Sequence, residues 1–348
     1  MNYSTDNTRI IDRKKVPAPY ELINNLPIDD DISKLVYGTR QEISQILHDK
    51  DDRLLVVVGP CSIHDVESAM EYANKLVEQN IKFKEDLLIV MRVYFEKPRT
   101  TVGWKGLIND PDLNDTFNIP KGIEIAREFL SEVTKIGLPT ATEFLDPFTP
   151  QYIGDLVSWG AIGARTTESQ THRQMASGLS MPIGFKNATG GSVQLAIDGM
   201  IACSGEHAFL GIDNEGKTSV VITKGNKANH IILRGGTSGT NYDSKSIKDA
   251  QDMLKKNNLE PNIVVDCSHG NSNKDHNRQP IVFNEVIKQK IDGNEKIIGI
   301  MLESNLSPGN QSLGDNIKDL EYGVSITDKC VGWEKTEETI MESYDILK

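Results

Sequence analysis

Ionisable and metal-binding side chains stand wherever a short apolar run of this sequence ends. The clearest example is N-I-V-V-D-C-S-H over 262–269, where the pattern of a buried strand stops at an acid, a thiol and an imidazole. Seven other runs end similarly, and the residues at the eight ends are Cys61, Arg92, Glu143, Arg165, Lys186, Arg234, His269 and Glu303. Charged side chains are rarely buried without partners, so this series favours a functional site over internal ion pairs.

These residues divide into two chemical groups. The first is cationic and suits a phosphorylated or carboxylated anion, because guanidinium forks bind such groups through paired hydrogen bonds. Its members are Arg92, Arg165, Lys186 and Arg234, with Lys97 and Arg99 from K-P-R-T. The second group offers metal ligands and comprises Cys61, His269, Glu303 and, after the last strand, Asp328. This mixed set predicts one divalent metal ion and leaves Mn, Fe, Co and Zn open.

The elements that must position these residues alternate between strand patterns and helix patterns. Eight such pairs predict an α/β protein with a (β/α)8 TIM barrel. In this fold the carboxyl ends of the strands meet at one face, and the first and eighth strands are neighbours. Two further strand-like runs surround the turn N-E-G-K and predict an inserted β-hairpin, about 207–224, between units 5 and 6.

The composition excludes several classes of protein and partner. The 348 residues carry a formal net charge of −12, which argues against binding to nucleic acid or to an anionic membrane. No apolar run approaches the roughly 18 residues of a membrane-spanning helix. The N-terminus lacks the apolar core of a signal peptide, so we expect a cytoplasmic protein. Polar residues 1–50 are predicted to be an extension that docks elsewhere on the protein or on another subunit, and 51–348 to be the catalytic barrel.

Several long motifs resemble type I 3-deoxy-D-arabino-heptulosonate 7-phosphate (DAHP) synthase. They are G-P-C-S-I-H-D, M-R-V-Y-F-E-K-P-R-T-T-V-G-W-K-G-L-I-N-D-P, G-A-R-T-T-E-S-Q, G-F-K-N, H-I-I-L-R-G-G and S-I-T-D-K-C-V-G-W-E. The resemblance runs from the N-terminus to the C-terminal helix. It implies a transferase that catalyses the first step of the shikimate pathway, towards the aromatic amino acids. Phosphoenolpyruvate, erythrose 4-phosphate and water would give the heptulosonate phosphate and inorganic phosphate.

The resemblance also implies roles for particular residues. The metal ligands would be Cys61, His269, Glu303 and Asp328. The residues near phosphoenolpyruvate would be Arg92, Lys97, Arg165, Lys186 and Arg234, with Glu143 and the Gly163–Ala164 backbone. Those near erythrose 4-phosphate would be Lys97, Pro98, Arg99, Thr100 and Asp328. Lys97, Glu143 and His269 are all candidates for proton transfer.

Feedback inhibition by an aromatic amino acid is a further implication, in a homodimer or homotetramer built through the N-terminal extension. The matching effector positions are Asp146, Pro150, Gln151, Leu179, Ser180, Phe209, Gly211 and Val221, with Asp6 and Asn7 from a neighbouring subunit. Within the family, serine at the position of Gly211 accompanies phenylalanine sensitivity and glycine accompanies tyrosine sensitivity. We therefore expect tyrosine as the effector, unless Gly211 merely suits the hairpin.

Two alternatives remain at this point. A 3-deoxy-manno-octulosonate 8-phosphate synthase would perform the same chemistry on arabinose 5-phosphate, but the K-P-R-T-T-V-G-W-K-G loop and the hairpin argue against it. A catalytically silent effector-binding barrel would have lost ligand or cationic residues, and none is missing. Two positions depart from many relatives, which have Lys where Thr237 stands and Ala where Gly270 stands. The first change would alter loop charge, and the second is expected only to loosen its loop.

Overall fold

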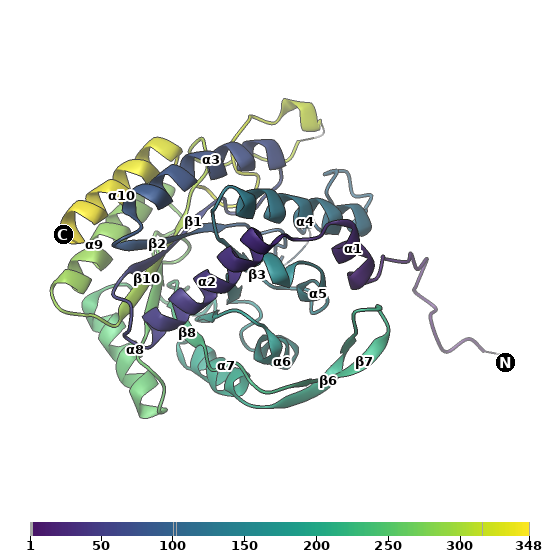
Figure 1. Ribbon diagram of the computed structural model, residues 1–348, viewed down its shortest axis with the longest axis horizontal. Helices are drawn as coiled ribbons and strands as arrows, with labels where there is room; N and C mark the ends of the chain where they lie inside the picture. The colour runs from purple at the N-terminus through teal and green to yellow at the C-terminus, as the bar shows by residue number, and fades with distance from the viewer. Residues whose placement is uncertain (1–2, 100, 102, 315, 348) are drawn as a thin grey trace.

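Eight parallel strands close into a barrel in the computed structural model, which describes residues 3–99, 101, 103–314 and 316–347 (Figure 1). The strands are β1 Leu54–Gly59, β2 Leu87–Arg92, β3 Thr140–Glu143, β4 Trp159–Ile162, β5 Ile183–Lys186, β8 Asn229–Leu233, β9 Ile263–Asp266 and β10 Ile297–Glu303. Their order around the barrel is β1-β10-β9-β8-β5-β4-β3-β2. The predicted TIM barrel is confirmed, and β1 pairs directly with β10, as expected for the first and last strands.

Helices surround the barrel and cover its outer surface (Figure 1). They are α3 Val66–Phe83, α4 Ile119–Lys135, α5 Pro150–Ile153, α6 Gln170–Gly178, α7 Gln194–Ser204, α8 Ser244–Lys256, α9 Gln279–Ile291 and α10 Trp333–Leu347. Side-chain caps fix several of their starts, because an acceptor at the N-cap satisfies a backbone N–H that the first turn leaves unpaired. Asp65 accepts from Glu67 N, and Asp243 accepts from Ser246 N.

The N-terminal region adds two helices, α1 Pro19–Asn25 and α2 Asp30–Leu47. Side chains of α2, among them Ile43 and Ile46, pack with the barrel interior in one apolar cluster. The helix is further attached through Arg40, whose guanidinium donates to Val157 O at 2.7 Å. In Figure 1 the segment before α1 extends away from the barrel. The domain boundary at residue 50 stays a prediction.

The inserted hairpin consists of β6 His207–Ile212 and β7 Thr218–Thr223, which pair antiparallel. It lies in the chain between α7 and β8, so its predicted position between units 5 and 6 is confirmed. The turn contacts the N-terminal region, where Tyr20 N donates to Asn214 O at 2.9 Å. Within the described part of the chain, no helix has both the length and the apolar character needed to cross a membrane.

Candidate active site

The predicted site residues meet at the carboxyl ends of the barrel strands. Arg92, Glu143, Lys186 and Glu303 are the last residues of β2, β3, β5 and β10. The other four follow their strands by one to three residues, and they are Cys61, Arg165, Arg234 and His269. This is the face that carries the active site in barrels of this type. The sequence prediction that the ends form one site therefore agrees with the fold.

A thiol and two carboxylates form the part of this face best suited to a metal ion. Ligand atoms of Cys61, Glu303 and Asp328 lie within 4.8 Å of one another. Burial and the neighbouring Glu303 raise the pKa of the Cys61 thiol. Burial would also raise the pKa of Asp328, but the nearby Lys97 ammonium lowers it. One sulfur and two oxygen donors fit a divalent cation such as Mn, Fe, Co or Zn.

His269 lies beside this cluster and is oriented by other residues. Its Nε2 is 3.9 Å from Glu303 Oε1, while its Nδ1 is 3.0 Å from Asp266 Oδ2 and 2.6 Å from Ser268 Oγ. The backbone of His269 has φ of 55°, a left-handed conformation that is uncommon for residues other than glycine. A histidine held through one ring nitrogen presents the other to a metal, as second-shell partners of metal ligands usually arrange.

Arg92 and Lys97 connect the cationic group to the thiol cluster. The Arg92 guanidinium is 1% exposed and donates to Glu303 Oε1 at 2.8 Å and to Pro60 O at 3.0 Å. It also stacks on the Tyr94 ring, with 3.5 Å from Cζ to the ring centroid. Lys97 Nζ donates to Cys61 Sγ at 3.2 Å. Burial would lower the pKa of Lys97, but Cys61 and Glu303 raise it, so the ammonium stays charged.

Lys186 is the second buried cation of the face. Its Nζ lies 3.1 Å from Asp266 Oδ2 and 4.0 Å from Glu143 Oε2. Glu143 packs against Gly163, where an added Cβ would approach Glu143 Oε1 to 2.3 Å. This contact leaves no room for a side chain at residue 163, and the role of both residues near phosphoenolpyruvate stays a prediction.

The loop after β8 carries Arg234, another member of the cationic group, and packs on the loop after β9. Arg234 N donates to Asn187 Oδ1 at 2.8 Å, and burial lowers the pKa of its guanidinium. An added Cβ at Gly270 would lie 2.4 Å from Gly236 N. The backbone of Gly270 packs directly on that of Gly235 and Gly236, and the expectation that Gly270 only loosens its loop stays a prediction.

Only some of the residues assigned to the sugar phosphate are among those that the structure describes. Arg99 Nε donates to Trp104 O at 2.9 Å, which fixes the loop that carries it, and Pro98 is partly buried. Of the residues assigned to phosphoenolpyruvate, Arg165 is exposed and Ala164 is partly buried after β4. Thr100 lies outside the described residues.

Six of the eight effector positions expected within one chain surround a small cavity of about 60 Å³. They are Pro150, Gln151, Leu179, Phe209, Gly211 and Val221. Asp146 lines an adjoining cavity instead, and Ser180 lines neither. Asp6 and Asn7 lie on the exposed N-terminal segment. The hairpin thus brings distant parts of the chain together as expected.

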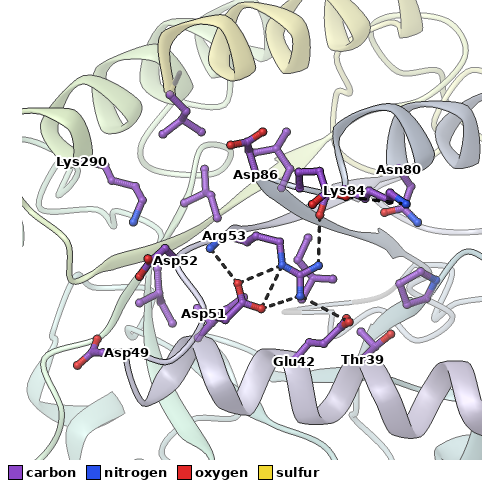
Figure 2. Close-up of a pocket in the computed structure, with 18 of the residues that line it drawn as sticks. Thr39, Glu42, Asp49, Asp51, Asp52, Arg53, Asn80, Lys84, Asp86 and Lys290 are labelled. Atoms are coloured by element: carbon purple, nitrogen blue, oxygen red, sulfur yellow. Dashed lines mark hydrogen bonds and ion pairs between the residues drawn. The ribbon is translucent and has the colours of Figure 1, made fainter.

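A larger cavity, of about 960 Å³, lies at the opposite end of the barrel (Figure 2). Its walls include the starts of β1 and β2 and contain none of the predicted site residues. In Figure 2 the Arg53 guanidinium contacts the carboxylates of Asp51 and Glu42, with the shortest distance 2.6 Å to Asp51 Oδ2. These charges pair with one another, so the strand ends remain the candidate active site.

Three buried polar residues of the active-site face were absent from the predicted set. Asp266 stands in the D-C-S-H run three residues before His269. Tyr94 and Glu96 belong to the quoted motif Y-F-E-K, where nothing distinguished them from core residues. Tyr94 stacks on Arg92, and Glu96 Oε1 accepts from Asp146 N at 3.0 Å. A rule that every polar residue at the end of a buried strand needs a role would have found Asp266.

Comparisons with known proteins agree with this geometry. The sequence profile of the DAHP synthetase I family matches residues 27–341. The Tyr-sensitive phospho-2-dehydro-3-deoxyheptonate aldolase of Escherichia coli (strain K12) is 49% identical over 342 residues, covering 98% of this chain and 96% of the relative. The Phe-sensitive enzyme of the same organism is 48% identical over 348 residues, covering 100% and 99%. A solved phospho-2-dehydro-3-deoxyheptonate aldolase from Francisella tularensis SCHU S4 matches with a TM-score of 0.94 at 50% identity, covering 97% of this chain and 98% of the other. This chain therefore belongs to the DAHP synthetase I family of transferases.

Proposed function

We propose that this enzyme condenses phosphoenolpyruvate with erythrose 4-phosphate and water, giving DAHP and inorganic phosphate. The observation that carries the proposal is the contact between the two groups of residues. Lys97 Nζ lies 3.2 Å from Cys61 Sγ, and Arg92 lies 2.8 Å from Glu303 Oε1. An anion bound by the cations would therefore lie beside the metal ion that the thiol and carboxylates would hold. That ion would make the aldehyde carbon electrophilic.

One divalent ion would be held by Cys61, Glu303 and Asp328, with His269 beside them. When bound, it would supply Lewis-acid polarisation of the aldehyde. The identity of the metal stays open among Mn, Fe, Co and Zn, since a mixed donor set suits several first-row ions. Metal removal should leave the barrel folded, because β1 and β10 are joined by their own ladder.

The chain's own residues would position phosphoenolpyruvate. Arg92, Lys186 and Arg234 would bind the phosphate and carboxylate of phosphoenolpyruvate, with Arg165 and Lys97 at its edges. This places the methylene carbon towards the aldehyde carbon, and a carbon–carbon bond forms between them. Water adds at the enol carbon as positive charge develops there, and phosphate departs. Lys97, Glu143 and His269 are the groups able to move protons at these atoms.

The second substrate and the effector are also proposals. Lys97, Pro98, Arg99 and Thr100 would bind the sugar phosphate, together with Asp328. Tyrosine would bind the small cavity of the hairpin, because an added Cβ at Gly211 would lie 2.7 Å from Val221 Cγ2 and narrow the space for a phenol. Asp6 and Asn7 of another subunit would complete that site in a cytoplasmic homodimer or homotetramer.

Consumption of phosphoenolpyruvate tests the reaction directly. The assay would compare erythrose 4-phosphate with arabinose 5-phosphate, and each aromatic amino acid would be added in turn. We expect turnover with the four-carbon sugar and selective inhibition by tyrosine. Preference for the five-carbon sugar would indicate the octulosonate synthase, and inhibition by phenylalanine would overturn the effector assignment alone. Absence of turnover with every divalent metal would indicate a silent binding protein.

A further inference from the structure

Three asparagines connect the loops that follow β5, β8 and β9 at the carboxyl face of the barrel. They are Asn187, Asn241 and Asn271, one from each loop, and Asn187 and Asn271 are 0% exposed. A buried amide side chain must find acceptors for its N–H groups and donors for its oxygen. Each of these residues therefore fixes the backbone groups that surround it.

Asn187 and Asn241 hold the backbone on both sides of Arg234. Asn187 Oδ1 accepts from Arg234 N at 2.8 Å, and Asn187 Nδ2 donates to Gly235 O at 2.9 Å. Asn241 Oδ1 accepts from Gly235 N at 2.7 Å. The two side chains also contact each other, because Asn241 Nδ2 donates to Asn187 Oδ1 at 3.1 Å. The peptide groups next to Arg234 thus depend on both asparagines.

Asn271 extends this network to the loop after β9. Its Oδ1 accepts from Asn241 N at 2.8 Å. Its Nδ2 donates to Leu233 O at 3.1 Å, at the end of β8, and to Asp266 O at 2.9 Å, at the end of β9. One amide therefore joins the ends of two neighbouring strands to the loop that carries Asn241.

The same contacts bring together residues that would bind the anion and the metal. Gly270 N donates to Arg234 O at 3.0 Å, and Gly270 directly follows His269. Gly235 and His269 both have left-handed backbone conformations, with φ of 68° and 55°. For His269, which is not a glycine, this conformation is costly and persists only where the surroundings hold it. The direction of its imidazole therefore depends on the packing of these two loops.

We propose that Asn187, Asn241 and Asn271 act as one positioning unit, which fixes the Arg234 guanidinium relative to the His269 imidazole. The guanidinium and the imidazole come from different loops, so the contacts between the loops set their separation. Substrates react at useful rates only when such groups are held to within a fraction of an ångström. The consequence for turnover rests on the proposed function, whereas the coupling between the loops does not.

Hydrogen exchange of the metal-free chain tests the coupling between the loops. Within the described part of the chain, Asn187 makes no hydrogen bond to residues 269–274. In Asn187→Ala, we nevertheless expect amide exchange to accelerate by about tenfold or more in residues 269–274 as well as in residues 234–241, because protection follows the opening of a cooperative unit. Asn241 is only partly buried, so Asn241→Ala is a second variant in which both segments should lose protection.

Asn226→Ala is the matched control. Asn226 lies before β8, at the opposite end of the barrel, and its Nδ2 donates to Leu179 O at 3.1 Å and to Met181 O at 2.9 Å. This substitution removes a bridging amide of the same kind, so it should lower thermal stability as the network variants do. Exchange in residues 234–241 and 269–274 should stay at the parent rate.

Binding of Mn²⁺ and steady-state kinetics measure the consequence for the site. Asn187→Ala and Asn271→Ala should each raise the Kd for Mn²⁺ and the KM for phosphoenolpyruvate by about tenfold, as when an outer partner of a metal ligand is removed. The double variant should lose less than the product of the two single losses, because members of one network are not additive. A purely structural role would lower the folded fraction, and hence kcat, and would leave the Kd and the KM unchanged.

Two results would overturn the proposal. The first is faster exchange in Asn187→Ala that is confined to residues 234–241, which would mean that the loop after β9 is held independently. The second is a Kd for Mn²⁺ and a KM for phosphoenolpyruvate that both single variants leave at the parent values. A parent chain that binds Mn²⁺ and shows the coupled exchange, but consumes no phosphoenolpyruvate, would count against the proposed function only.

Discussion

Asp266 joins the two chemical groups of the active site at the scale of single residues. Its Oδ2 lies 3.1 Å from Lys186 Nζ and 3.0 Å from His269 Nδ1, and the residue is 0% exposed. Burial alone would raise the pKa of Asp266, but His269 and Lys186 lower it well below its ordinary value. The carboxylate is therefore ionised at neutral pH. Its negative charge orients Lys186 of the cationic group and His269 of the metal-binding group.

Replacing Asp266 with Asn removes this charge and keeps the size of the side chain. We expect metal affinity or kcat to fall by about 10–100-fold, the usual loss when an outer partner of a metal-binding histidine is changed. Metal titration and steady-state kinetics would measure both quantities. Asp252→Asn, at an exposed position on α8, is the matched control and should change neither. Parent-like values in Asp266→Asn would show that Lys186 and His269 hold their positions without it.

The residues that the sequence allowed us to predict are those whose type alone suggests chemistry. Arg92, Lys186 and Glu303 are charged residues at the ends of apolar runs, where a structural role is improbable. Glu96 could not be recognised in this way, because its role depends on the segment at 145–149, about fifty residues away. Contacts of that kind follow from the packing of loops and leave no local pattern.

We propose that regulation depends on the hairpin β6–β7. Its strands are only partly buried, and the inward-facing side chains Phe209, Gly211 and Val221 line the small cavity. Because neighbouring residues of a strand face opposite sides, a change at residue 211 acts on the cavity and a change at 208 does not. The hairpin therefore offers a matched pair of positions for testing effector selectivity.

Gly211→Ser should convert tyrosine sensitivity towards phenylalanine sensitivity. The added Cβ would lie 2.7 Å from Val221 Cγ2, so the cavity must narrow unless that valine moves. We expect the inhibition constant for tyrosine to rise by about tenfold, equivalent to ~1.4 kcal/mol, with unchanged turnover in its absence. Inhibition curves for tyrosine and phenylalanine would show the change. Ala208→Ser, on the exposed face, is the control, and identical curves for both variants would contradict the role of Gly211.

Strand positions were most predictable where a barrel strand is a largely apolar run, as in β1, β2 and β10. The short helix α5 was harder to predict, since it ends at Ile153 and a 3-10 turn over 154–156 follows it. Glycine at 154 lowers the helix propensity of that stretch. The close packing of Gly270 on Gly235 was not predictable either, because it joins loops that follow different strands.

The barrel as a whole encloses one neutral histidine that makes its stability depend on pH. His230 Nε2 accepts from Trp159 Nε1 at 3.0 Å, and both residues are 0% exposed. Burial lowers the pKa of His230 to about 4, whereas an unfolded histidine has a pKa near 6.5. The unfolded chain thus binds a proton more readily, so this contribution to stability is complete above about pH 6.5 and declines as the pH falls towards 4.

Denaturant unfolding at pH 7 and at pH 4 would measure this contribution. His230→Gln keeps an acceptor for Trp159 but cannot titrate. We expect the parent protein to lose ~3 kcal/mol more unfolding free energy over this interval than the variant, because two and a half pKa units are worth about that much. Carboxylates titrate in both proteins, so the difference isolates His230. An equal loss in both would mean that His230 is already protonated or becomes accessible in the folded barrel.

The closed strand order was the part of the whole molecule that the sequence predicted best. Eight strand–helix pairs of ordinary length have few alternatives to closure, and closure alone places Cys61 near Glu303. The position of the N-terminal segment relative to another subunit could not be derived, because residues 3–16 are exposed in the single chain. Assembly therefore stays a prediction.

Titration of metal-free enzyme with Mn²⁺ tests the central claim most directly. The consumption of phosphoenolpyruvate, with erythrose 4-phosphate present, would be followed as the metal is added to the chelator-treated chain. The account predicts no turnover before addition and a rise that saturates at one ion per chain, with Cys61→Ser requiring far more metal. Full turnover in the chelated protein, or saturation unaffected by Cys61→Ser, would contradict a metal-dependent site at the ends of β1 and β10.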